Sequence, residues 1–157
     1  FDIICLSNTV HHLEDLTDTY TGMSKLLNKD GVIIINEMIA DNLNPAQISH
    51  KLLHHFAAKV DREIGRVHDE TYNRADLISK ITDLAKEKVV DVWDMIFEDD
   101  SIDYDFNPYE NLLDHLVKIV ANKENANDFK EEADEIKEYI KSNGFKSATQ
   151  VVIIIKK

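Results

Sequence analysis

The sequence predicts an α/β fold with a parallel sheet, and three observations support this class. The chain opens on Phe1–Leu13, FDIICLSNTVHHL, and its apolar start is matched by Val32–Asn36, VIIIN. Both are short apolar runs of the kind expected for strands covered on both faces. A segment with helical periodicity separates them, and a last apolar run, Gln150–Ile155, lies near the end of the chain. Strand, crossover helix and strand form the unit from which parallel sheets are built.

The first two helices are predicted from periodicity and end signals. Apolar residues at spacings of three and four predict a helix from Leu13 to Leu27. The turn at Gly31 ends it, where glycine is expected to supply backbone freedom. Asn44, followed directly by a proline, predicts the N-cap of a second helix, which Gly65 closes.

A third helix and a third strand are predicted next. The helix runs from about Arg74 to Lys86, with Asn73 as its cap. The following run, Val89–Phe97, reads as a strand that carries two aspartates among apolar residues. A strand with this mixture is less buried than the first two, so we expect it near an edge of the sheet.

The last part of the chain is predicted to be mostly helical. Asn107 and a following proline, with Glu110 three positions after the cap, start one helix. After a polar loop, a highly charged helix ends at the pair Asn143 and Gly144, a common C-cap combination. The strand Gln150–Ile155 follows.

Length and composition favour one domain, residues 1–157, because 43% of the 157 residues are hydrophobic. The segments 44–71 and 98–127 interrupt the alternation of strands and helices. We expect both to be helical insertions that cover the substrate side. The formal net charge of −12 argues against nucleic acid as a partner, because it repels a phosphate backbone.

The single cysteine and the lengths of the apolar runs bear on the cellular compartment. The single Cys5 lies in the apolar first run, where it is expected to act as a small buried hydrophobe in a reducing cytoplasm. No apolar run reaches the roughly 20 residues of a membrane-spanning helix, so a cytoplasmic protein without a membrane partner is expected. Because Phe1 already lies in a strand pattern, we suspect a missing N-terminal segment or a homo-oligomer that covers this strand.

Candidate site residues follow the predicted strands. Ser7, Asn8, His11 and His12 come directly after the first strand. Glu37 follows the second strand and is predicted to contact the substrate. Ligands of open parallel sheets bind outside the carboxyl ends of the strands, which favours a site here. The alternative is structural: Ser7 and Asn8 only satisfy backbone groups at a strand end, and one of the histidines caps the helix.

Histidines also gather on the helix after Asn44. His50 and His54 lie one turn apart, a spacing that could hold a metal ion, but no cysteine or regularly spaced third ligand completes a site. We therefore predict no metal. An amphipathic lid helix is favoured, and as a lid it could place His54, His55 or Tyr72 against a substrate.

The acidic run Asp99–Glu110 has the spacing of a calcium-binding loop. Tyr104 occupies the position that requires glycine, however, and a strand is predicted before the run. A solvated acidic loop is the favoured interpretation.

The opening run, followed by a helix ending in MSKLLNKDGVIIINEMI, resembles the second half of class I S-adenosylmethionine-dependent methyltransferases, from the fourth strand onward. The segment His68–Ala85 resembles that family's helix before the sixth strand. Ser142–Lys157 resembles its final helix exit and seventh strand. The resemblance implies an incomplete Rossmann-like methyltransferase sheet with helical insertions.

The resemblance also implies a function. Ser7 and Asn8 would lie beside the methionine portion of S-adenosylmethionine, with His11 and His12 near the transferred methyl group, and the acceptor would be a small molecule. The family's glycine-rich cofactor loop is absent from these 157 residues, so the pocket is incomplete in this chain. The alternatives are a non-catalytic, truncated methyltransferase-like domain that binds a partner or oligomerises, and another α/β enzyme.

Overall fold

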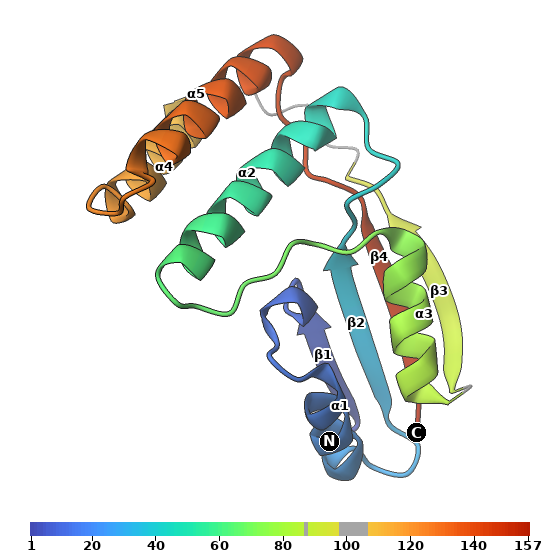
Figure 1. Ribbon diagram of the computed structural model, residues 1–157. Helices are drawn as coiled ribbons and strands as arrows, with labels where there is room; N and C mark the ends of the chain where they lie inside the picture. Colours follow the sequence, from blue (N-terminus) through green and yellow to red (C-terminus); the bar gives the residue numbers. More distant parts are fainter. Residues whose placement is uncertain (87, 98–106) are drawn as a thin grey trace. The chain divides into compact units, whose positions relative to one another are not determined.

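The computed structural model describes residues 1–86, 88–97 and 107–157, which form two compact units (Figure 1). The sheet unit consists of Phe1–Asp41, Thr71–Ile96 and Thr149–Lys157. The helical unit consists of Asn42–Glu70 and Phe97–Ala148. Each unit is therefore built from segments that are distant in the sequence. The segments predicted as insertions supply two helices of the helical unit, and their covering of a substrate stays a prediction.

Four strands form the sheet: β1 (Ile3–Ser7), β2 (Val32–Met38), β3 (Val89–Met95) and β4 (Gln150–Lys156). Their order is β1-β2-β4-β3. β1 and β2 are parallel, and β4 runs antiparallel to both β2 and β3. The predicted α/β class and the edge position of β3 are confirmed.

Within these 157 residues, the first strand is not covered on both faces. β1 lies at the other edge of the sheet, and its side chains alternate between exposed and half-buried. Ile3 is 57% exposed and Cys5 is also exposed, whereas Ile4 and Leu6 pack against the core. Cys5, which its apolar neighbours predicted to be buried, is exposed within these 157 residues. A run this short cannot distinguish a doubly covered strand from an edge strand by periodicity.

One apolar core joins the sheet to helices α1 (Leu16–Leu26) and α3 (Arg74–Ala85). Both helices pack on the same face of the sheet, the face to which Ile33 and Ile35 of β2 point. The fully enclosed core residues are Val10, Leu16, Met23, Leu27, Ile33, Ile35, Ile39, Leu77, Ile81, Ala85, Val151, Ile153 and Ile155. Burial of this apolar set is the main favourable term that stabilises the unit.

Gly31 is required for close packing between α1 and β2. A Cβ atom at Gly31 would lie 2.8 Å from the Leu27 Cγ, closer than real Cβ atoms come, and 3.0 Å from the Asp2 carbonyl oxygen, which is a tight contact. Its backbone is not among the positive-φ glycines, which are Gly65 and Gly144. The prediction that Gly31 supplies backbone freedom is therefore wrong, because the residue is needed for space.

The helical unit contains α2 (Pro45–Glu63), α4 (Asn107–Ile119) and α5 (Ala126–Asn143). Their apolar faces form a second core, in which the Phe56 and Phe129 rings meet edge to face at 6.0 Å. Polar pairs cross the helices at the surface: Lys59 to Glu132 at 2.5 Å and Lys137 to Asp114 at 2.7 Å. Exposed pairs of this kind contribute little beside the apolar core. None of the helices among the described residues has the length and apolar composition needed to cross a membrane.

Most predicted helix ends are confirmed. Asn44 caps α2 in a capping box with Gln47. Gly65 and Gly144 follow α2 and α5 with φ angles of +83° and +75°, a region that favours glycine. The cap of α3 differs from the prediction.

Asn73 stands at the N-cap position of α3, but its side chain makes no capping hydrogen bond. The first backbone N–H of the helix, at Arg74, instead donates to the Asp41 carboxylate at 2.8 Å. Local sequence could not reveal this partner, because it lies 33 residues earlier in the chain.

The first turns of α2 also hold the segment that follows α5. The Ser49 hydroxyl donates to the Gly144 carbonyl at 2.6 Å, and the Ala148 N–H donates to His50 Nδ1 at 2.9 Å. Burial lowers the pKa of His50 from its ordinary value of 6.5. A neutral imidazole suits this position, because Nδ1 must keep its lone pair to accept the Ala148 N–H.

Two glycine variants test the packing requirement. Gly31→Ala should lower the free energy of unfolding by about 1–3 kcal/mol, because the new methyl group overpacks the α1–β2 contact. Gly22→Ala is the matched control, since nothing lies within 4 Å of a Cβ at that position of α1. This change should raise stability by about 0.5–1 kcal/mol. Urea unfolding followed by circular dichroism measures both, and equal effects would contradict the packing account.

The lowered pKa of His50 predicts acid sensitivity. The stability supplied by neutral His50 is fully present above 6.5 and is lost as the pH falls below 6.5 toward the lower pKa of the folded state. In His50→Asn, the side-chain oxygen can accept the Ala148 N–H without titrating. Urea unfolding between about pH 8 and about pH 5 should therefore show a smaller loss for the variant than for the wild type. Parallel losses would show that other groups account for the acid sensitivity.

Candidate functional site

The polar residues after β1 and β2 meet at the carboxyl ends of the two parallel strands, as predicted. The last pair in the register is Ser7 and Asn36. Asn8 follows with a φ angle of +46°, which asparagine tolerates better than most residues. Its N–H donates to the Asn36 carbonyl at 2.8 Å, and its side-chain oxygen accepts the Met38 N–H at 3.1 Å. Asn8 thus fixes the exit of β1 to the end of β2.

Glu37 organises the turn that follows. Its Oε2 accepts the backbone N–H groups of Thr9 at 3.0 Å and Val10 at 2.7 Å. These donors begin the 3₁₀ turn η1 (Val10–His12). The side chain of Glu37 is fully buried, and a buried carboxylate is stable only when its oxygens are paired. The next turn of the chain supplies those partners.

His11 is the third partner of Glu37. Its Nδ1 lies 2.6 Å from Glu37 Oε1, and the histidine is 1% exposed. A carboxylate can only accept a hydrogen bond, so Nδ1 is assigned as the donor to Glu37 Oε1. The pair therefore has the arrangement of a histidine base that is oriented by a carboxylate.

Ser7 and His12 lie close to His11 in the sequence, but their side chains are not buried as those of Glu37 and His11 are. Ser7 and His12 are both exposed. The His12 ring lies 4.3 Å from the His11 ring, centroid to centroid, at an angle of 45°. The strand end thus presents one buried and one exposed imidazole, together with the exposed side chains of Ser7 and Asn8.

Tyr72, a predicted substrate contact, belongs to the sheet unit. Its carbonyl accepts the Ala40 N–H at 2.9 Å, which places its backbone near the end of β2. Its ring packs against the core of the unit, and the Lys80 ammonium lies 5.1 Å from the ring centroid. The ring is therefore held against α3.

His54 and His55, the other predicted contacts, lie on α2 in the helical unit. The His54 ring packs edge to face against His68 at 5.0 Å. His55 Nδ1 lies 3.5 Å from the Glu70 carboxylate. The structure thus gathers these histidines with the segment that follows α2, and their role against a substrate stays a prediction.

Asp61 shows the electrostatics of this histidine cluster. It pairs with His68 Nδ1 at 2.8 Å and with Arg66 at 3.1 Å. Partial burial works to raise the pKa of Asp61, but the hydrogen bonds from His68 and Arg66 outweigh it and hold the pKa below its ordinary value. The carboxylate is therefore charged at neutral pH and fixes the His68 ring.

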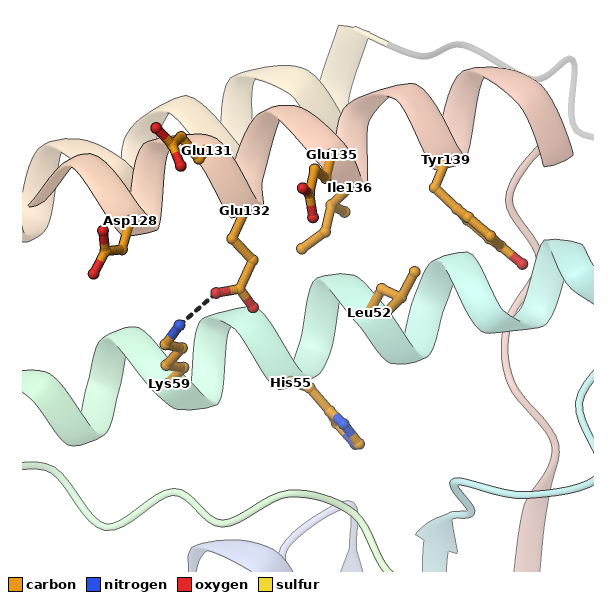
Figure 2. A pocket seen from close by; sticks show the side chains of 9 residues that line it. All are labelled: Leu52, His55, Lys59, Asp128, Glu131, Glu132, Glu135, Ile136 and Tyr139. Atoms are coloured by element: carbon orange, nitrogen blue, oxygen red, sulfur yellow. Dashed lines mark hydrogen bonds and ion pairs between the residues drawn. The ribbon is translucent and has the colours of Figure 1, made fainter. Parts of the chain in front are cut away.

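His55 also lines an open groove of about 610 Å³ between α2 and α5 (Figure 2). Leu52 and Ile136 provide its apolar contacts, and Lys59 reaches across to Glu132. Its acidic lining residues lie along α5: Asp128, Glu131, Glu132 and Glu135. This acidic stripe contributes to the negative charge of the protein.

Sequence reasoning identified His11 and Glu37 as separate site residues but missed their contact. The two residues are 26 positions apart, and only the β1–β2 register brings them together. An acidic residue at the end of a buried strand, next to a histidine-rich turn after the preceding strand, is the signal that could have revealed the pair. The acidic residues considered for calcium binding at 99–105 lie outside the described residues.

Comparisons with known proteins identify the fold. No protein-family model matches the chain, and no curated protein matches it. A cyclopropane-fatty-acyl-phospholipid synthase-like protein from Lactobacillus casei has a similar structure, with a TM-score of 0.64 and 13% identity over 100% of this chain. A "putative methyltransferase" from Bacillus halodurans gives a TM-score of 0.51 and 11% identity, also over 100% of this chain. The predicted Rossmann-like methyltransferase fold is thereby confirmed.

The present chain spans only part of these two proteins. It covers 56% of the Lactobacillus chain and 64% of the Bacillus chain. At these low identities the likeness establishes the fold, while chemistry must be argued from the residues themselves.

Variants of Glu37 test its central position. Glu37→Ala should lower the free energy of unfolding by about 3 kcal/mol, because two backbone N–H groups and the His11 ring lose a buried acceptor. Glu37→Gln keeps an oxygen for the N–H groups and should lose about 1–2 kcal/mol. Its amide N–H would donate to His11 Nδ1 and move the imidazole proton to Nε2. Urea unfolding measures the losses, and ¹⁵N NMR of the imidazole reports the tautomer. An unchanged tautomer in Glu37→Gln would contradict the assigned hydrogen bond.

Proposed function

We propose that this chain is part of an S-adenosylmethionine-dependent methyltransferase that acts on a small-molecule acceptor. The observation that carries the proposal is the buried Glu37–His11 pair at the carboxyl ends of β1 and β2. Ligands of open α/β sheets bind at such ends, and the fold resembles that of a protein described as a methyltransferase. A carboxylate-oriented imidazole at this position supplies a base for the reaction.

The cofactor is proposed to lie against Ser7 and Asn8. Both side chains are exposed at the strand end, and the Asn8 oxygen already accepts the Met38 N–H. The Asn8 amide and the Ser7 hydroxyl therefore offer donors, which suit the carboxylate of a methionine moiety. A glycine-rich loop for the rest of the cofactor is absent from these 157 residues. We infer that a part of the protein outside them supplies that wall.

His11 is proposed to accept the proton that the acceptor loses. S-adenosylmethionine, when bound, supplies a methyl group on a positively charged sulfur. The O–H or N–H proton that the acceptor gives up on methylation would pass to His11 Nε2, an atom that the described residues bury. Glu37 stabilises the resulting imidazolium through Nδ1–H. Glu37 thus acts as a positioning residue, in place of the direct substrate contact predicted from sequence.

The acceptor is proposed to be small and neutral or cationic. A net charge of −12 disfavours polyanionic substrates such as nucleic acids. His12 borders the same strand end and is proposed to contact the acceptor. His54, His55 and Tyr72 remain proposed substrate contacts, and the cytoplasm remains the proposed location.

A second candidate function is a non-catalytic module that binds a partner or a second copy of the chain. The exposed edge strand β1 favours it, because Ile3 is 57% exposed and Cys5 is exposed on the same strand. Apolar edge strands pair readily with other chains. The two candidates differ in whether S-adenosylhomocysteine binds.

The test uses protein expressed from the whole coding sequence. Calorimetry should show saturable binding of S-adenosylhomocysteine, and transfer from methyl-labelled S-adenosylmethionine to a panel of small amines and alcohols should identify acceptors. His11→Gln should lower kcat by about a hundredfold with little change in cofactor affinity. Glu37→Gln should lower kcat and remove the limb of the pH–rate profile that belongs to the base. His115→Gln, at an exposed histidine of α4, is the matched control.

Two results would contradict the methyltransferase proposal. One is wild-type turnover in His11→Gln. The other is the absence of S-adenosylhomocysteine binding by the whole protein. In the second case, concentration-dependent dimers in analytical ultracentrifugation that disappear in Ile3→Lys would establish the partner-binding function instead.

A further inference from the structure

A second groove, here called the lysine groove, lies in the sheet unit between α1 and α3. Its volume is about 600 Å³, within the range of small-molecule sites. The end of α3, the residue before β3 and the last residue after β4 contribute to its lining. These segments lie at the amino ends of β1 and β2, opposite the Glu37–His11 pair.

The groove concentrates positive charge in an acidic protein. Among the described residues, Lys25, Lys86, Lys88 and Lys157 line it, together with the acidic Asp83. The protein as a whole carries a net charge of −12. Four ammonium groups around one cavity repel one another, and a bound anion would relieve that repulsion.

Helix ends account for only some of these lysines. Lys157 donates to the Leu27 carbonyl just after α1, and Lys25 lies in the last turn of that helix. Lys86 occupies the C-cap of α3. A cation at such positions is favoured by the helix dipole. Lys88 lies beyond the C-cap of α3, so the helix dipole does not account for its position.

The backbone fixes two of these lysines in place. Lys86 has a φ angle of +48°, and its N–H donates to the Thr82 carbonyl at 3.0 Å. The Lys88 carbonyl accepts the Lys156 N–H at 3.0 Å. Within the part of the chain that the structure describes, no ion pair is recorded for Lys25, Lys86 or Lys88. Lys25, Lys86 and Lys88 are all exposed.

Hydroxyl groups face the lysines from α1. Thr17, Thr21 and Ser24 follow one another at spacings of four and three, so they form a row along one side of the helix. Hydroxyl and ammonium donors together suit the several acceptor oxygens of a phosphate group. Tyr20 and Leu84 add apolar lining on which an organic moiety can pack.

We propose that the lysine groove binds a small phosphorylated molecule, with its phosphate held by Lys25, Lys86 and Lys88 and its organic part against Tyr20 and Leu84. This site is separate from the proposed methyl-transfer site and does not depend on it. The ligand would bridge α1 and α3, the two helices that cover the same face of the sheet.

The experiment titrates protein expressed from the whole coding sequence with sodium pyrophosphate at constant ionic strength, followed by ¹⁵N–¹H NMR and calorimetry. Saturable shifts should be confined to the amides around Thr17–Lys25, Asp83–Lys88 and Lys157. Lys25→Ala/Lys88→Ala should weaken binding by about tenfold or more, because two charge-assisted contacts are lost. Lys118→Ala/Lys130→Ala removes two exposed lysines of the helical unit and is the charge-matched control. It should bind pyrophosphate as the wild type does.

Three results would overturn the proposal. The first is equal weakening by both double variants, and the second is shifts spread over lysines throughout the chain. The third is saturable binding of a polyglutamate peptide but not of pyrophosphate, which would indicate an acidic protein partner. Far-UV circular dichroism and urea midpoints of each variant establish that the fold is intact, so a loss of binding reports on the groove.

Discussion

The candidate site depends on one buried carboxylate, Glu37. It is placed by the parallel register of β1 and β2, and its oxygens receive two backbone N–H groups and the His11 ring. A buried carboxylate without partners would cost several kcal/mol. The turn after β1 must therefore fold back over the end of β2. This single requirement sets the path of Thr9–His12, the orientation of the imidazole and its tautomer, so the chemistry of the strand end follows from a constraint on burial.

Local signals in the sequence were sufficient for most of the fold. The Asn44 capping box, the glycines after α2 and α5, and the aspartates of β3 each act within a few residues, and the structure agrees with each. The α3 cap shows where such reasoning ends. Its acceptor, Asp41, lies far from Arg74 along the chain, and a sequence pattern carries no information on which distant carboxylate will arrive at a helix end. The Glu37–His11 contact was missed for the same reason.

Two further errors concern space and position in the sheet. Cys5 was predicted to be buried because its neighbours are apolar, but apolar composition does not specify which strand lies at an edge. Because Gly31 follows a helix, it was predicted to adopt a backbone conformation that other residues rarely adopt. Its actual constraint is the approach of the Leu27 side chain, which depends on how α1 packs on the sheet. Both outcomes are tertiary, and neither has a signature in the local sequence.

The net charge of the protein predicts which small anions it binds less well than the distribution of charged side chains over its surface does. The overall −12 argues against a polyanion, because such a ligand covers a large area and meets the protein's average potential. A single phosphate group meets only the charges near it, since at physiological ionic strength the screening length is about 8 Å. The acidic stripe of α5 and the lysine groove show that charge is segregated within each unit. An acidic protein can therefore disfavour nucleic acid and still hold a small anion, provided that several of its lysines line one cavity.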